Sequence, residues 1–321
     1  MRVEPNAKFG AFFLSQCAVR ADIPQEEGLR AGMWLTRRLG FEIADHWRTW
    51  LGSLIADEMR EAGFGMYVTV PSTSPDVVDG ENAALEQRAN DLLNGLLLQG
   101  VPRFERGFVA HGVNRNGTIE IRGFSPMDHH YRTVGFDFVI GAAEVHRTVT
   151  LAERLRHVEN SLPDWGRLLR GIRTLLLANR QTNTVGDRLH QFVRSIEAVI
   201  KPGPGKSRND FAHRGQTVAL NNAETRELLL QMYDLRSLVE HLNVPTDALP
   251  PGGTREQQRR LVDRRTRQAD LLARHVFIKI LESPGLSGAF RTDDQIDAFW
   301  QMDHGDRVRL WGDRLDIERI E

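Results

Sequence analysis

From about residue 164 onward, apolar residues recur at the spacing of an α-helix almost without interruption. One face of the stretch 184–201, for example, carries Val185, Leu189, Phe192, Val193 and Ile196. Four segments have this amphipathic character, namely 164–180, 184–201, 222–243 and 254–283. Because most of the connections between them are short, the sequence predicts an antiparallel helical bundle.

The first half of the chain mixes helical and strand patterns. The clearest is at 106–124, where polar and apolar residues alternate around Asn116-Gly117, a strong signal for a tight hairpin turn. The other predicted elements are a helix at 46–63, a strand at 64–72, a helix at 82–100 and a further strand at 132–141. We therefore expect an α+β protein in which a mixed α/β domain, residues 1–158, precedes an all-α domain, residues 159–321.

Composition excludes several classes of protein. The chain has 321 residues and a single cysteine, Cys17, so it has neither an intrachain disulfide nor a Cys-rich zinc site. No run approaches the roughly 18 apolar residues of a membrane helix, and the N-terminus does not look like a secretory signal. We therefore expect a cytoplasmic protein with no membrane partner.

The charges are unevenly distributed, although the formal net charge is only -1. Residues 160–280 hold 20 Lys and Arg against 12 Asp and Glu, whereas residues 1–159 and 281–321 are both acidic. A local positive field of this kind can attract a polyanion. Solvated helix faces account for the same charges equally well, so this pattern alone decides nothing.

The ten residues SRNDFAHRGQ, at 207–216, lie in this basic region, between the second and third predicted helices. The preceding KPGPGKS resembles a phosphate-binding loop, but Ile200 stands where that motif needs Gly, and a helix comes before it. The prolines and glycines are therefore predicted to end the helix and turn the chain. We expect a long loop here, and long loops on a rigid scaffold often carry function.

Arg208 and His213 together supply two needs of RNA cleavage. Histidine titrates near physiological pH, so His213 can take the proton that the ribose 2′-OH must lose before it attacks the phosphorus. Arg208 stays cationic and offers a planar fork of donors to the charged phosphorane. Neither role needs a metal. The leaving 5′-oxygen must gain a proton in the same step, which a second copy of the motif across a two-fold axis would supply.

The string Arg208-Asn209-Asp210-Phe211-Ala212-His213 resembles the R-x4-6-H signature of the HEPN superfamily, with Asn209 at the favoured polar position. The helix before it, 187–200, contains Glu197 among apolar residues and is similar to the corresponding helix of the ApeA-like branch. The resemblance covers roughly residues 160–245, with 283 as its furthest limit. The N-terminal half lies outside it.

The resemblance implies a HEPN-like helical bundle and a metal-independent endoribonuclease without a cofactor. It implies a homodimer whose motifs face each other, with Arg208 and His213 at catalytic positions and Asn209 at a supporting one. Many members act in bacterial toxin–antitoxin or anti-phage abortive-infection systems and cleave tRNA or other RNA. Such a role implies an antitoxin or a phage-derived trigger as a partner, and the N-terminal domain would then sense the trigger, restrain the nuclease or select the RNA.

Other basic and acidic residues extend the candidate site. Glu197 and Arg214 are candidate supporting residues, and Lys206, Arg259 and Arg260 are candidate RNA contacts. Phosphate contacts by these cations would make RNA binding strongly salt-dependent. Each also has a plain structural interpretation: Glu197 as the partner of a neighbouring cation, and the others as solvated side chains.

Two alternatives remain open. The first is a non-catalytic HEPN-fold protein that binds RNA or a partner. The second is a metal-dependent enzyme centred on His129 and His130, with Asp128 and His111. Adjacent residues of a strand point to opposite faces, so these two histidines are poor joint ligands in regular structure, and we expect no metal site.

Overall fold

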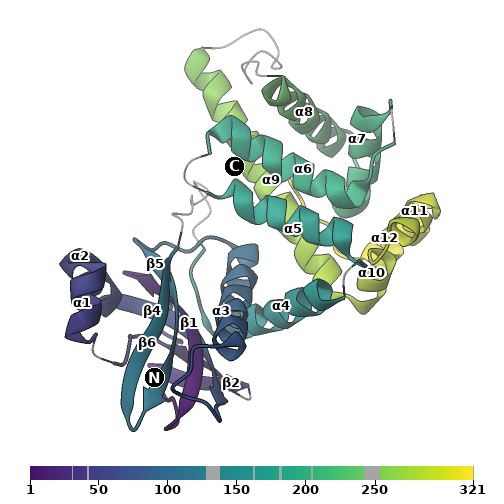
Figure 1. Cartoon of the computed structure of the whole chain (residues 1–321). Helices are drawn as coiled ribbons and strands as arrows, with labels where there is room; N and C mark the ends of the chain where they lie inside the picture. The colour runs from purple at the N-terminus through teal and green to yellow at the C-terminus, as the bar shows by residue number, and fades with distance from the viewer. Residues whose placement is uncertain are drawn as a thin grey trace. The chain divides into compact units, whose positions relative to one another are not determined.

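The computed structural model describes residues 1–30, 32–41, 43–127, 138–161, 163–180, 183–203, 205–241 and 254–320. These residues form two compact units, which divide between residues 155 and 156 (Figure 1). The first unit contains the sheet and the second is helical. The chain is therefore an α+β protein.

The first unit is built on a six-stranded antiparallel sheet with the order β2-β3-β4-β1-β5-β6. The strands are β1 (Ala7–Ser15), β2 (Glu26–Arg30), β3 (Met33–Thr36), β4 (Ala62–Pro71), β5 (Gly107–Arg115) and β6 (Thr118–Pro126). The helices that accompany them are α1 (Asp45–Leu51), α2 (Ser53–Arg60), α3 (Gly80–Gln99) and α4 (Ala142–Asn160), of which α4 carries the chain into the second unit.

Strand β1 is buried along its whole length because helices cover both faces of the sheet (Figure 1). Phe9 and Phe13 point to one face and pack in a cluster with Met59 of α2. Gly10 points to the other face, where an added Cβ would lie 2.2 Å from the carbonyl oxygen of Leu85 in α3. Only glycine therefore allows α3 to approach the sheet this closely.

The predicted hairpin is confirmed as β5 and β6. Asn116 and Gly117 form the turn, with φ of 52° and 93°, and Arg115 pairs with Thr118. Positive φ at both central residues matches the twist of the two strands, which is why Asn-Gly is favoured there.

Other expectations for this unit were incomplete. The predicted helix at 46–63 is two helices, because Gly52 adopts φ 84° and ends α1. The predicted strand at 132–141 lies mostly outside the described residues. Strands β1, β2 and β3 and helix α4 were not predicted at all.

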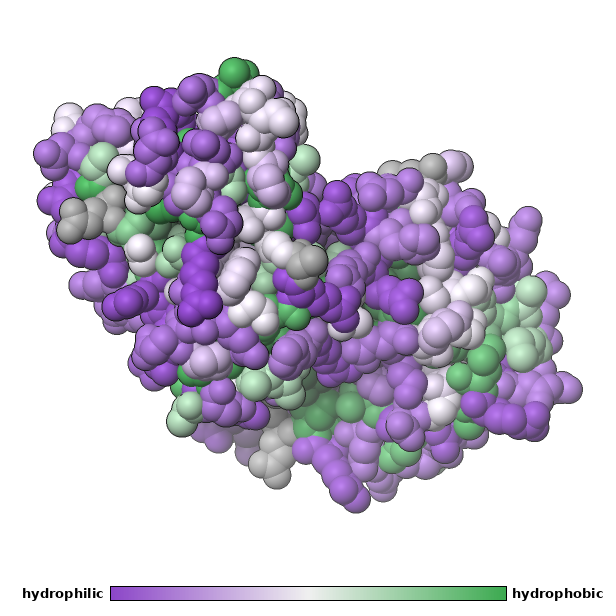
Figure 2. Space-filling model, turned by 90° about the horizontal axis from the view of Figure 1, so that it is seen from below, coloured by the Kyte–Doolittle hydropathy of each residue, from purple (hydrophilic) through white to green (hydrophobic). Residues whose placement is uncertain are grey.

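The second unit contains the four predicted helices, confirmed as α5 (Gly166–Ala178), α6 (Val185–Ile200), α8 (Ala223–Glu240) and α9 (Arg255–Glu282). Helix α6 lies between α5, α8 and α9, and its apolar residues Leu189, Phe192 and Ile196 are fully buried. The remaining helices are α7 (Ser207–Val218), α10 (Pro284–Ala289), α11 (Asp293–Gln301) and α12 (His304–Trp311). Among the described residues, no helix is both long and apolar enough to cross a membrane. The face drawn in Figure 2 is covered mainly by hydrophilic side chains.

Candidate active site

The Arg–His motif lies on a helix. We predicted a loop across 202–220, and this was wrong: α7 spans Ser207–Val218. The segment before it does turn the chain, where Lys201 with φ 49° ends α6. Phe211 and Gly215 of α7 are buried, and an added Cβ at Gly215 would lie 2.9 Å from Leu229 of α8. Helix α7 therefore packs closely on α8, which fixes the motif on a rigid element.

The two motif side chains point in different directions. Residues five apart on an α-helix are separated by roughly 140° around its axis. Arg208 accordingly turns toward α8, and His213 lies beside α12. Both side chains and that of Asn209 are exposed. The described contacts include no bond between Arg208 and His213, so each is exposed beside a different neighbouring helix.

Arg208 forms a side-on ion pair with Asp234 of α8. Its Nε donates to Oδ1 at 2.6 Å and its Nη2 donates to Oδ2 at 2.7 Å. The hydrogen bonds that the guanidinium donates to Asp234 raise the pKa of Arg208. Asp234 binds the Nε and Nη2 edge of the guanidinium. Nη1 takes no part in this pair and can donate to an incoming oxyanion.

His213 has a second histidine as its neighbour. The ring of His304, the first residue of α12, lies 6.3 Å from the His213 ring between centroids. Asn221 Nδ2 lies 3.1 Å from His304 Nε2, and His304 Nδ1 is buried with no hydrogen-bond partner among the described residues. Burial lowers the pKa of His304, and the charges of Arg307, His213 and Arg314 lower it further.

Glu197 contacts α8, and no described bond joins it to Arg208 or His213. It forms an ion pair with Arg236 at 3.1 Å, and each side chain is only 14% exposed. Burial raises the pKa of Glu197, while the Arg236 charge opposes that shift. From the sequence we expected a cation close to Glu197 in the chain as its partner. The observed partner, Arg236, lies on α8.

Arg214 has structural contacts that connect α7 to the end of α6. Its Nη1 donates to the carbonyl oxygen of Ile200 at 2.8 Å and to that of Lys201, which are orphan acceptors at the end of α6. Its guanidinium also lies 5.5 Å from the ring centroid of Trp300. These contacts hold α6, α7 and α11 together, so the guanidinium has little freedom to bind phosphate.

The three candidate RNA contacts are all exposed. Lys206 is the residue directly before α7, whereas Arg259 and Arg260 lie in the N-terminal part of α9. Arg260 pairs with Glu256, one turn earlier on its own helix. No described contact joins these cations to the motif.

The proposed histidine metal site cannot be assembled from the described residues. Asp128, His129 and His130 lie outside them. His111 is described, and it contacts the side chains of Asn82 and Glu86 in the first unit. Across the described ranges, no three His, Cys, Asp or Glu side chains are grouped as a metal site would need.

Two residues that the sequence analysis did not consider therefore adjoin the motif, Asp234 and His304. Both come from other helices, and nothing in their local sequence marks them. No protein-family model, curated protein or solved structure matches this chain.

Proposed function

We propose that this protein is a metal-independent endoribonuclease whose second unit is a HEPN-like bundle. The observation that carries the proposal is the exposed Arg208–His213 motif on α7, with Arg208 held in a fixed orientation by Asp234. An exposed cation with a defined orientation is what a scissile phosphate requires.

The reaction follows from the chemistry of these groups. His213 takes the proton of a ribose 2′-OH, and the 2′-oxygen attacks the adjacent phosphorus. The P–O5′ bond breaks, the leaving oxygen is protonated, and the products are a 2′,3′-cyclic phosphate and a 5′-hydroxyl. Arg208 binds the phosphorane oxygens through its free Nη1 edge, and Asn209, exposed beside it, orients the substrate.

The second proton carrier comes from a partner copy in this proposal. Two chains related by a two-fold axis would bring two His213 side chains to one phosphodiester, one as base and one as acid. His304 is a nearer source of an imidazole within one chain. The two arrangements predict different activities for mixed dimers of wild-type and His213→Ala chains.

The biological role in the proposal is bacterial anti-phage defence or a toxin–antitoxin system, with tRNA among the candidate substrates. The sheet-containing unit would sense a trigger, restrain the nuclease or select the RNA. An antitoxin or a phage-derived molecule would be the partner.

One observation favours a non-catalytic alternative, in which the bundle only binds RNA or a partner. Asp234 already neutralises Arg208, so the motif presents less positive charge than two free side chains would.

The discriminating experiment is incubation of the purified chain with total RNA in EDTA. We expect cleavage by the wild type, none by His213→Ala and wild-type cleavage by His146→Ala, which changes an exposed histidine of the first unit. RNA binding without cleavage by any variant would favour the alternative.

A further inference from the structure

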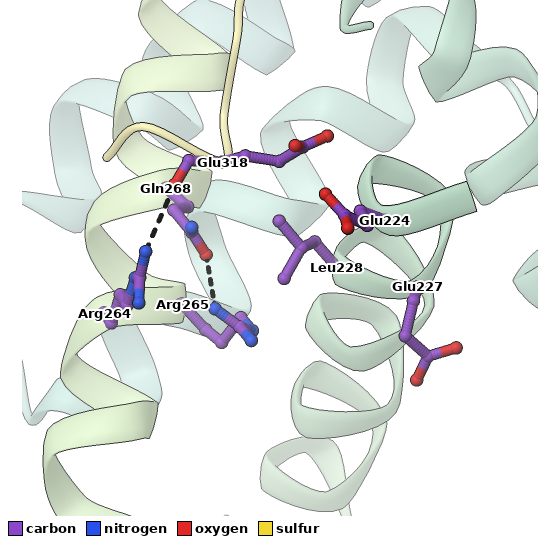
Figure 3. A pocket seen from close by; sticks show the side chains of 7 residues that line it. All are labelled: Glu224, Glu227, Leu228, Arg264, Arg265, Gln268 and Glu318. Carbon is purple, nitrogen blue, oxygen red and sulfur yellow. Dashed lines mark hydrogen bonds between the residues drawn. The ribbon is translucent and has the colours of Figure 1, made fainter. Parts of the chain in front are cut away.

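A pocket of about 320 Å³ lies between α8, α9 and the C-terminal segment (Figure 3). The side chains that line it are Glu224, Glu227, Leu228, Arg264, Arg265, Gln268 and Glu318. Cations line the α9 side, and carboxylates line the side made by α8 and Glu318 (Figure 3). Neither the motif nor the proposed nuclease reaction uses any of these side chains.

Arg265 is a buried cation whose hydrogen-bond partners are neutral. The residue is 7% exposed, and its guanidinium donates to the amide oxygens of Gln231 at 2.9 Å and Gln268 at 2.7 Å. Burial, followed by the neighbouring charge of Arg264, lowers the pKa of Arg265 to about 10. A buried charge is costly unless an opposite charge compensates it. The nearby charge of Glu227 raises this pKa, but the hydrogen bonds of the guanidinium go to neutral amides and not to that carboxylate.

Arg264 adds a second positive charge to the same wall. Its Nε donates to the carbonyl oxygen of Ile320 at 3.0 Å, and its Nη2 donates to that of Glu318 at 3.1 Å. These acceptors are again neutral. The α9 wall therefore presents two guanidinium groups whose described hydrogen bonds all go to neutral oxygens.

The opposite wall holds a pair of interacting carboxyl groups. A hydrogen bond between Glu224 and Glu318 raises the pKa of Glu224. Glu318 Oε1 accepts from Asn222 Nδ2 and Thr225 Oγ1, each at 2.7 Å, which fixes this carboxylate at the start of α8. Leu228 lies between the two walls (Figure 3).

We propose that this pocket binds a small zwitterion of the α-amino-acid type. Its carboxylate would neutralise Arg265 and Arg264. Its ammonium group would replace the hydrogen bond between Glu224 and Glu318, whose shared proton would be released to solvent. Leu228 would contact the carbon skeleton, as apolar groups do in small-molecule sites. A simple anion would leave the carboxylates uncompensated, and a simple cation would leave Arg265 unpaired, so only a ligand with both charges satisfies both walls.

The test compares three matched probes by isothermal titration calorimetry on the full chain: L-leucine, N-acetyl-L-leucine without the ammonium charge, and L-leucinamide without the carboxylate. Loss of one charged hydrogen-bonding group should weaken binding about tenfold or more. We therefore expect L-leucine to bind at least about tenfold more tightly than either analogue. Equal binding of the three, or no binding of L-leucine, would overturn the proposal.

Two variants keep the test independent of folding. Arg265→Met replaces a buried charge by an apolar side chain, which is often neutral or stabilising, and it should abolish L-leucine binding. Glu224→Gln changes an exposed rim residue and should weaken L-leucine but not N-acetyl-L-leucine. Arg255→Met, an exposed change on the same helix, is the control and should bind as the wild type does. Wild-type affinity in Arg265→Met would overturn the proposal, whatever the nuclease assay shows.

Discussion

Arg208 and Asp234 form a two-bond ion pair that ties α7 to α8, with both donor–acceptor distances below 3 Å. The Arg208 side chain is 48% exposed, so solvent screens the pair and its contribution to stability is small. The pair instead orients Arg208, because Asp234 binds one edge of the guanidinium and leaves the other edge open.

Replacing Asp234 by Asn should therefore affect activity more than stability. We expect RNA cleavage to fall roughly ten- to hundredfold, because a misplaced cation no longer matches the phosphorane. The free energy of unfolding should change by no more than about 1 kcal/mol. Cleavage kinetics together with urea denaturation check this. Asp306→Asn, which disturbs an exposed pair with Arg309, is the matched control. An active Asp234→Asn protein would show that Arg208 needs no orienting partner.

Mixed dimers distinguish the two sources of the second imidazole. If two His213 side chains share one site, co-expressing wild-type chains with an equal amount of His213→Ala chains should leave about one quarter of the activity, because only wild-type pairs are complete. If His304 serves in the same chain, about one half should remain. Our proposal predicts the quarter. A linear dependence on the wild-type fraction would assign the role to a residue within each chain.

Arg214 should behave as a structural residue. Removing its bonds to Ile200 and Lys201 leaves carbonyl groups at the end of α6 without their charged donor. Arg214→Ala should lower the free energy of unfolding by about 1–2 kcal/mol, whereas Arg309→Ala, an exposed change, should lower it by less than about 0.5 kcal/mol. Chemical denaturation measures both. If Arg214→Ala folds normally but loses RNA affinity, the phosphate-binding interpretation from the sequence is correct.

Because the pKa of His304 is lowered in the folded chain, we predict that the free energy of unfolding depends on pH. Its folded-state pKa lies below the ordinary value of 6.5, so between the two values the unfolded chain binds more protons. The favourable contribution of His304 to the free energy of unfolding is therefore present above pH 6.5, and it is lost as the pH falls through the folded-state pKa. The stability difference between wild type and His304→Gln, from denaturation at several pH values, should shrink on acidification. The charges that lower this pKa come from Arg307, His213 and Arg314. A difference that grew on acidification would contradict the assignment.

Long amphipathic helices were predictable from the sequence, and α7 was not. Helices α6 and α9 repeat apolar residues over several turns, so their periodicity is clear. Helix α7 has twelve residues, follows a Pro-Gly segment and buries little more than Phe211, Ala212 and Gly215 before its last turn. A glycine on the buried face suggests a turn when the close contact with Leu229 is not known.

Strand β1 was missed for a different reason. It is buried on both faces, so its sequence AKFGAFFLS is a short apolar run without polar alternation, which periodicity alone does not assign. The neighbours of the motif, Asp234 and His304, come from α8 and α12, and such tertiary contacts leave no mark in the local sequence. The motif was found in the sequence and its chemical role stays a prediction, whereas the residues that lie beside it could be identified only from the fold.

The most direct test of the central claim is the chemical nature of the RNA ends. Mass spectrometry of a cleaved oligonucleotide, incubated with the chain in EDTA, should show 2′,3′-cyclic phosphate and 5′-hydroxyl ends. A 2′-deoxy substitution at the cleaved position and the His213→Ala variant should each abolish them. Ends carrying 3′-hydroxyl and 5′-phosphate groups, or RNA left intact by the wild type, would contradict the account.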